Sequence, residues 1–330
     1  MPTEATVAKL RPYTPDEIEA ISEQLYSAYG DVQGRLLKTL ARGDITSWRK
    51  AFTSQQLAQV ERMLDDLNAT TAFWTETHVP DLYKRGLWTA DGYLQPGGLS
   101  KFAHPGEWTP MDLGMARMHD EAVRILAENV ALPLQEANSY CAQRIGDMVA
   151  RAQKMAELAG KGRTIPAGLT ELDYLRDTAE GQVQLRIRDA SLRSMQQAFA
   201  QGMTRQEASR AFVGELQRRG VPCFIDRAGR EWNMETYSSM VSRTVAHEAQ
   251  RHGLQNRMVE LGEDLVEVIP HTRFKDSCDE YEGKLLSITG KSVGQTVGGR
   301  KVVASVDHAR ATSHLFGPNC THTAVPYIAD

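Results

Sequence analysis

Apolar side chains recur along most of the chain at the three-to-four-residue spacing of amphipathic helices. The first such run follows Thr14-Pro-Asp-Glu17, which offers a capping hydroxyl, a proline at the first helical position and acids in the first turn. We therefore predict helices over residues 14–67, with Gly34 and Gly43 separating shorter segments.

Residues 68–111 interrupt this pattern, because proline, glycine and tryptophan are frequent there. Trp74, Trp88 and Trp108 supply enough apolar surface for packing, whereas the prolines and glycines disfavour a regular helix. We predict an ordered, loop-rich segment for this stretch.

Helical spacing returns at Met111 and is strong from there on. We expect Pro133 to break or kink this part of the chain, and a long helix to end at Gly160. Another helix is predicted over residues 170–201. Thr204 then begins a Thr-Arg-Gln-Glu capping box, which predicts the start of one more helix.

The pattern changes after Gly220, which should end this last helix. Short runs of alternating apolar and polar residues predict a β-hairpin over residues 221–232, and a helix from Met234 to Leu261 follows it. Further strands are predicted in three places: residues 264–269, 284–288 and 298–304.

These patterns predict a mainly α fold with a small α+β C-terminal domain, in which a long-helix body precedes a compact unit of few strands. A chain of 330 residues is long enough for more than one core. The predicted division has three parts: an N-terminal helical and loop-rich region over residues 1–111, the long-helix body over 112–220, and an α+β module over 221–330.

Composition and sequence motifs mainly exclude classes of function. The chain has 38 Lys and Arg against 42 Asp and Glu, a net charge of −4, and no strongly basic segment, which disfavours a dedicated DNA-binding protein. The N-terminus lacks the pattern of a secretory signal, and no apolar run is long enough to cross a membrane. The sequence also lacks the motifs of phosphate loops, dinucleotide sites, zinc proteases and serine hydrolases, so we predict that the chain is not an enzyme.

Two cysteines and two histidines near the C-terminus are the strongest candidates for a site. Cys278, Cys320, His271 and His322 together form the donor set of a tetrahedral zinc site, although the cysteines are single residues on separate loops. The same residues also suit two buried thiols with two polar turn residues, or a Cys278–Cys320 disulfide. We expect the two loops to meet, with Cys141 elsewhere in the helical body.

A nuclease site is a weaker possibility in the same region. Asn319-Cys-Thr-His322, with His308 or His314 upstream, imitates a His-Asn-His site, in which a metal and a base activate water. The chain lacks the basic surface that such an enzyme needs for free DNA. Asn319 after a proline is also typical of a turn, where it bonds the backbone of its own loop.

The charged residues beside these loops each allow more than one structural or functional interpretation. Four carboxylates crowd the loop before the strand at 284–288, which suits either acid–base chemistry or a solvated surface. They are Asp276, Asp279, Glu280 and Glu282. Arg243, in the helix before the module, suits a contact with this loop, a cap on strand ends, or an ordinary surface position. We favour the loop contact, because this helix must pack on the small sheet.

Several segments of the C-terminal part occur in a characteristic order. They are Tyr237-Ser-Ser-Met-Val-Ser-Arg243-Thr244, Glu263-Asp-Leu-Val-Glu-Val268, His271-Thr-Arg273, Tyr281-Glu-Gly283-Lys-Leu-Leu-Ser-Ile-Thr-Gly290 and Leu315-Phe-Gly-Pro-Asn319-Cys320-Thr-His322. This series resembles the minor capsid proteins of tailed bacteriophages, which share a C-terminal module with the head-morphogenesis protein F of phage Mu. In this resemblance Arg243, Gly283 and Asn319 belong to the structural motif of the module.

The resemblance implies a structural virion protein, present in few copies in the phage head near the portal vertex and assembled in the host cytoplasm. The implied partners are the portal protein and the major capsid or scaffolding protein, with weak contact to packaged DNA and none with a membrane. The implied role is head assembly and DNA packaging or ejection. Some relatives carry a toxin domain after the module, and none is expected after Asp330. The competing hypothesis is a nuclease or transferase effector built on the terminal His, Asn and Cys cluster.

Overall fold

The computed structural model describes residues 12–42, 45–46, 50–94, 113–270, 277–318 and 320–328. Contacts between residues group the chain into two compact units. Unit 1 consists of Met1–Gln24, Phe73–Val130 and Met240–Asp330, and unit 2 consists of Leu25–Ala72 and Ala131–Ser239. Each unit therefore combines segments that are far apart in the sequence. The predicted sequence ranges 1–111, 112–220 and 221–330 are a different kind of division and stay a prediction.

Long α-helices make up most of the described residues. Four of them contribute residues to both units: α2 (Pro15–Arg42), α3 (Lys50–Leu94), α4 (Leu113–Gly160) and α7 (Met234–Glu260). The shorter helices each belong to one unit: α5 (Ala190–Ala200) and α6 (Arg205–Arg219) to unit 2, and α8 (Val306–Ser313) to unit 1. No helix within the described ranges combines the length and the apolar character that crossing a membrane requires.

The prediction of a loop-rich segment is wrong for residues 68–94, which belong to α3. Val79 and Leu82 are fully buried on either side of Pro80, which lies inside the helix. Burial of this apolar stripe outweighs the local preference of proline against helix, because tertiary packing supplies most of the stability of a helix in a protein. Residues 95–111, with Trp108, lie outside the described residues.

Two predicted interruptions of helices are absent from the described part of the chain. Gly34 lies inside α2 rather than between two helices, and Pro133 lies inside α4 without breaking it. Val130 and Leu134 beside this proline are fully buried, so packing again holds the helix together across an unfavourable residue. Gly43 lies outside the described residues.

A β-hairpin replaces the first half of the helix predicted over residues 170–201. Its strands, β1 (Glu171–Thr178) and β2 (Gly181–Arg188), pair antiparallel over eight residues each. Leu172 and Tyr174 are buried on one face of β1, at the spacing of two that is typical of a strand. The helical interpretation overlooked this short alternation among charged residues.

Several helix ends follow their sequence signals. Asp189 caps α5, because its carboxylate accepts two hydrogen bonds from backbone N–H groups of the first turn. Thr204 and Glu207 form the predicted capping box of α6. Gly220 ends that helix with a φ of 78°, which favours glycine, and Gly160 is the last residue of α4 as predicted.

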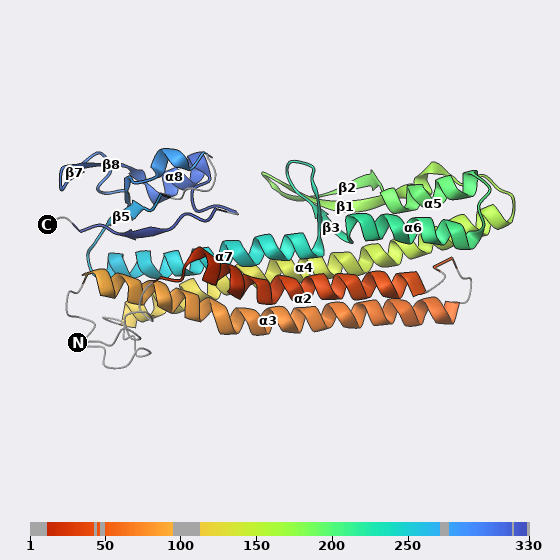
Figure 1. Ribbon diagram of the computed structural model, residues 1–330, viewed down its shortest axis with the longest axis horizontal. Helices are drawn as coiled ribbons and strands as arrows, with labels where there is room; N and C mark the ends of the chain where they lie inside the picture. The colour runs from red at the N-terminus through yellow and green to blue at the C-terminus, as the bar shows by residue number, and fades with distance from the viewer. Residues whose placement is uncertain are drawn as a thin grey trace. The chain divides into compact units, whose positions relative to one another are not determined.

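Each unit contains a small sheet, drawn in green for unit 2 and in blue for unit 1 in Figure 1. The described strands of unit 2 run in the order β2-β1-β3-β4, in which β3 (Pro222–Ile225) and β4 (Glu231–Asn233) form the predicted hairpin. Those of unit 1 run in the order β7-β8-β6-β5-β9. Their bounds are β5 (Leu265–Val268), β6 (Leu285–Ser287), β7 (Thr296–Val297), β8 (Arg300–Ser305) and β9 (Ala324–Pro326). The predicted mainly α fold with a small C-terminal α+β part is confirmed.

The order of strands in unit 1 brings three connecting segments to one edge of the sheet. β5 pairs antiparallel with both β6 and β9, and β6 pairs parallel with β8. The edge where β5 ends is therefore the edge where β6 and β9 begin. One apolar core joins this sheet to α7 and α8, and it includes Leu254, Val266, Leu286, Ala309 and Phe316.

Within unit 1, α3 and α7 touch through their backbones at two glycines. A Cβ on Gly86 would lie 2.0 Å from the carbonyl oxygen of Gln250, and one on Gly253 would lie 2.0 Å from the carbonyl oxygen of Tyr83. No side chain fits into such a distance, so only glycine permits this contact at either position. The contact lies next to the C-terminal core, because Leu254 belongs to that core.

Candidate functional site

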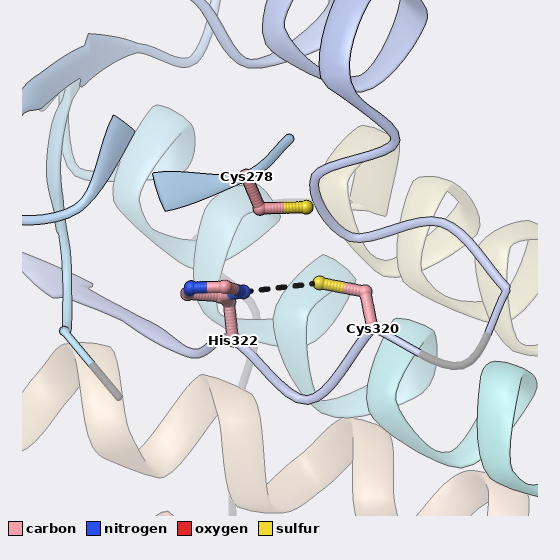
Figure 2. A group of neighbouring side chains, drawn as sticks. All are labelled: Cys278, Cys320 and His322. Carbon is pink, nitrogen blue, oxygen red and sulfur yellow. Dashed lines mark hydrogen bonds between the residues drawn. The ribbon is translucent and has the colours of Figure 1, made fainter. Parts of the chain in front are cut away.

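Three side chains with metal-binding groups meet at the edge of the sheet where β5 ends. Cys278 lies in the loop after β5, just before the 3-10 helix η3 (Asp279–Tyr281), and Cys320 and His322 lie between α8 and β9. One ligand atom from each of these residues lies within 4.8 Å of the other two. Figure 2 shows the two thiols and the imidazole directed toward a common space. The predicted meeting of the two cysteine loops is thus present in the structure.

Cys278 is the more deeply buried of the two thiols, with 4% of its surface exposed. Its Sγ donates a hydrogen bond of 3.3 Å to the carbonyl oxygen of Ser313. The hydroxyl of Ser277 donates to the same oxygen over 2.5 Å. The last residue of α8 therefore holds the loop that follows β5.

Cys320 is half-buried, and a tight turn supplies its hydrogen-bond donor. Its Sγ accepts a bond of 3.2 Å from the backbone N–H of Phe316. Phe316 and His314 have φ angles of 61° and 63°, which cost on the order of 1 kcal/mol for a non-glycine residue. Arg251 of α7 supports this turn, since its Nη1 lies 3.4 Å from the Phe316 carbonyl oxygen and its guanidinium lies 4.8 Å from the ring centroid.

His322 links the thiols to a carboxylate. Its Nδ1 lies 3.4 Å from Cys320 Sγ, and its Nε2 lies 3.0 Å from Glu282 Oε1. Because an ionised carboxylate only accepts hydrogen bonds, Nε2 carries a proton. In the neutral ring, the lone pair of Nδ1 therefore faces Cys320. Glu282 thus fixes both the orientation and the tautomer of the imidazole.

Burial and hydrogen bonding act in opposite directions on Cys320 and His322. Although burial opposes ionisation of the thiol, hydrogen bonds with the His322 side chain and backbone and with the Phe316 backbone hold the pKa of Cys320 below its ordinary value. Burial likewise disfavours the imidazolium, but the contacts with Cys320 and Glu282 raise the pKa of His322. The thiol of Cys320 consequently loses its proton more readily than that of an exposed cysteine.

The other two cysteines lie in unit 2 and do not belong to the group of possible metal ligands among the described residues. Cys141 is fully buried, donates its S–H to the sulfur of Met234 over 3.5 Å, and has a pKa that burial raises to about 12. Cys223 donates to the carbonyl oxygen of Trp232 over 3.1 Å. All four cysteines are free thiols, so the disulfide considered from the sequence is not formed.

The two motif residues that the structure describes have structural contacts. Arg243 forms an ion pair with Glu19 of α2, a contact that the sequence did not suggest, and its predicted contact with the acidic loop stays a prediction. Gly283 has a φ of 64° and donates its N–H to the carbonyl oxygen of Val268 over 2.8 Å. Its own carbonyl oxygen accepts from Arg300 over 2.8 Å. Glycine at this position therefore allows the sharp turn into β6.

The remaining predicted site residues differ in whether the structure brings them to the cluster of Cys278, Cys320 and His322. Within the described residues, the group of possible metal ligands does not include His308 or His314, and both are exposed. The His-Asn-His alternative thus gains no support from their positions. Of the acidic loop, Glu282 contacts His322. The predicted site residues that lie outside the described residues are His271, Asp276 and Asn319.

Sequence reasoning missed three partners of the site: Glu282 as the acceptor for His322, the Phe316 N–H, and the Ser313 carbonyl. Glu282 was visible only as one acid among several. Its place just before β6, with His322 just before β9, becomes informative once both strands are known to pair antiparallel with β5. Backbone donors and acceptors leave no trace in side-chain identity, so spacing alone does not reveal them.

Residues 119–330 match the sequence model of the family described as phage minor capsid protein 2. The match covers more than half of the chain and contains Cys278, Cys320, His322 and Glu282. Comparison with curated proteins and comparison with solved structures give no match. The finer resemblance to protein F of phage Mu stays a prediction.

Proposed function

The chain belongs to the phage minor capsid protein 2 family, and from this membership we propose that it works beside the portal of the phage head. Membership makes it a structural phage protein of the virion that associates with other head proteins. The proposal adds a position at the portal vertex and a role in head assembly and in DNA packaging or ejection. The family match over residues 119–330 is the observation that carries it.

The charge of the chain supports protein partners in preference to DNA. A protein that mainly binds DNA neutralises phosphates with a basic surface, whereas this chain has a net charge of −4. We propose the portal protein as the first partner and the major capsid or scaffolding protein as the second. Contact with packaged DNA would then be weak and incidental.

The composition of purified particles tests the proposal directly. Quantitative mass spectrometry of particles from the phage that encodes the chain should find it at a few copies per particle, far below the major capsid protein. Absence from particles, or a copy number equal to that of the major capsid protein, would contradict the proposal.

Cross-linking of procapsids tests the portal contact separately. Lysine-reactive cross-linking followed by mass spectrometry should connect this chain to the portal protein, with the major capsid protein as the abundant internal control. Links to the capsid lattice alone, at many equivalent positions, would place the chain away from the portal. The family membership would then stand and the portal position would be wrong.

One observation favours a second candidate, a transferase effector. Cys320, His322 and Glu282 form a thiol–imidazole–carboxylate series, the order of nucleophile, base and orienting group in thiol-dependent acyl transfer. The cavity beside His322 has a volume of about 40 Å³, however, whereas sites for organic substrates have several hundred. Acyl-transfer, protease or nuclease activity of the purified chain that Cys320→Ser abolishes would favour the effector over the structural role.

A further inference from the structure

We propose that Cys278, Cys320 and His322 bind a structural zinc ion, and that Glu282 orients the histidine from outside the ligand set. The site would connect the loop after β5, the turn after α8 and the segment that enters β9. This inference rests on the geometry of the described residues and is independent of the proposed role at the portal.

The spacing of the donor atoms suits zinc without a large rearrangement. Zinc bonds of about 2.3 Å to sulfur and about 2.0–2.1 Å to nitrogen, at tetrahedral angles, place sulfur and nitrogen about 3.6 Å apart. The observed distance between Cys320 Sγ and His322 Nδ1 is 3.4 Å. The Cys278 donor also lies within 4.8 Å of both. Three protein ligands leave one tetrahedral position for a fourth donor.

Glu282 has the position of an outer-shell carboxylate. Histidines that bind zinc usually donate their other ring N–H to a carboxylate or a carbonyl oxygen, which fixes the tautomer and makes the ligand nitrogen more basic. His322 meets this description, since Nε2 contacts Glu282 over 3.0 Å while Nδ1 faces Cys320.

The hydrogen bonds of the two sulfurs are compatible with their ionised forms. Cys320 Sγ already accepts from the Phe316 N–H, and such a bond becomes stronger when the sulfur is a thiolate. Cys278 donates its proton to Ser313 and would lose this bond when zinc binds. The Ser313 oxygen keeps a partner, because Ser277 also donates to it. Two thiol protons would leave for each zinc bound.

The ligand types and the surrounding fold favour zinc in a structural role. Thiolate with imidazole suits zinc, whereas calcium and magnesium require oxygen ligands. The C-terminal sheet has strands of two to six residues, so its backbone ladder is short. Small cores of this kind often depend on a metal ion for stability.

The metal content of the full chain is the first test. The protein, purified without metal-chelating resin, should contain about one equivalent of zinc by mass spectrometry of the elements. Replacement of zinc by cobalt should produce the ligand-to-metal absorption of cobalt thiolates and the visible bands of a tetrahedral ion. A folded chain without zinc, and without either cobalt signal, would overturn the proposal.

Variants identify the ligands. Cys278→Ser, Cys320→Ser and His322→Gln should each lose the zinc, while Cys141→Ser, which removes a buried thiol from unit 2, should keep it. Glu282→Gln retains all three ligands and should weaken zinc binding by about 10–100-fold in a chelator competition. This variant, together with cobalt spectra of the unmodified chain, keeps the test valid even where a ligand variant fails to fold. Retention of a full equivalent of zinc by Cys320→Ser would show a different site and would refute the assignment.

Discussion

The sheet of unit 2 and the sheet of unit 1 are of similar size but are held together differently. In unit 2, β1 and β2 pair without interruption over eight residues, and most of β2 is exposed. In unit 1, β6 has three residues, all buried, and β7 has two. A long antiparallel ladder is stabilised by its own hydrogen bonds and cross-strand pairs, whereas short strands depend on what packs around their ends.

Unit 2 has a permanent cation where its elements meet. Arg144 of α4 is 2% exposed, donates to the carbonyl oxygen of Pro222 over 2.7 Å, and lies 3.6 Å from the ring centroid of Tyr174. Its Nη2 is 3.8 Å from Asp189, which also accepts from the Tyr174 hydroxyl. An arginine stays charged at all ordinary pH values. This connection should therefore respond to neither metal nor mild acid.

Unit 1 contains groups whose state depends on conditions. The thiols and imidazole at the edge of its sheet are groups that can exchange protons and could hold a metal ion. All nine histidines of the sequence also fall within the segments of unit 1, and none falls within those of unit 2. The comparison shows one sheet with a long ladder beside a buried fixed charge, and another with short strands beside titratable side chains that meet across loops.

The largest expected effect is that of Arg144→Ala in unit 2. It removes the bond to Pro222, leaves Asp189 without its nearest cation and opens a cavity, so we expect a loss of about 3–5 kcal/mol in the free energy of unfolding. Urea unfolding measures the loss, and hydrogen exchange should locate it in β1–β4. The control is Arg186→Ala, which removes an exposed arginine of β2 paired with Asp173 and should leave stability unchanged. Equal loss of hydrogen-exchange protection in β5–β9 would contradict the expected difference between the two sheets.

The second effect is that of Cys320→Ser in unit 1. Whether the thiol binds zinc or only packs, its loss should lower the free energy of unfolding by about 2–4 kcal/mol, because the turn after α8 loses its link to His322. Hydrogen exchange should show early opening of β5 and β9, while β1–β4 keep their protection. Thr321→Ala changes an exposed neighbour and serves as the control. A harmless Cys320→Ser would mean that the sheet does not depend on this edge.

The third effect concerns the backbone contact under the C-terminal core. In Gly253→Ala the new Cβ would collide with the carbonyl oxygen of Tyr83, so α3 and α7 must separate, at a cost of about 1–3 kcal/mol. Thermal unfolding measures the cost. Gly146→Ala, in α4 with open space around it, should instead be neutral or stabilising by up to about 1 kcal/mol. A neutral Gly253→Ala would show that the two helices adjust without strain.

The fourth effect is a pH dependence that two histidines give to unit 1. Burial, with a smaller contribution from Arg251, lowers the pKa of His247 and of His252 from 6.5 to about 4. Arg243 adds to this lowering at His247 and Arg310 at His252, whereas Glu19 opposes it at His247. Between these values the unfolded chain binds protons that the folded chain does not, so stability falls as pH drops from about 6.5 toward 4.

Unfolding at pH 7 and pH 5.5 tests this dependence. We expect the double variant His247→Gln and His252→Gln to flatten it, because glutamine does not titrate. Hydrogen exchange, corrected for the intrinsic effect of pH, should show the acid-sensitive opening in unit 1. Acid-induced opening that begins in β1–β4 would contradict the assignment of titratable stability to unit 1.

Helix boundaries and strand positions were predictable wherever a local signal exists. The capping box at Thr204, the stop at Gly220 and the start at Pro15 depend on a few neighbouring residues, and the structure confirms all three. The loop predicted around Pro80 was wrong and Pro133 does not end its helix, because burial of distant partners decides whether a helix tolerates a proline. The alternative of a kink at Pro133 stays a prediction. The β1–β2 hairpin was missed for the same reason, since its short alternation becomes decisive only when one face is covered.

By itself, the sequence determined the alternation of long helices with a terminal α+β part, the family, and two cysteines and two histidines as candidates for a site. Only the tertiary structure decided that Cys278, Cys320 and His322 share one edge of a sheet and that Glu282 orients the ring. The physical reason is that β5 pairs with β9 across a long stretch of intervening chain. The pairing of β9 with β5 depends on how the apolar surfaces of the whole unit are buried. Residue spacing along the sequence therefore does not predict which strand lies beside β5.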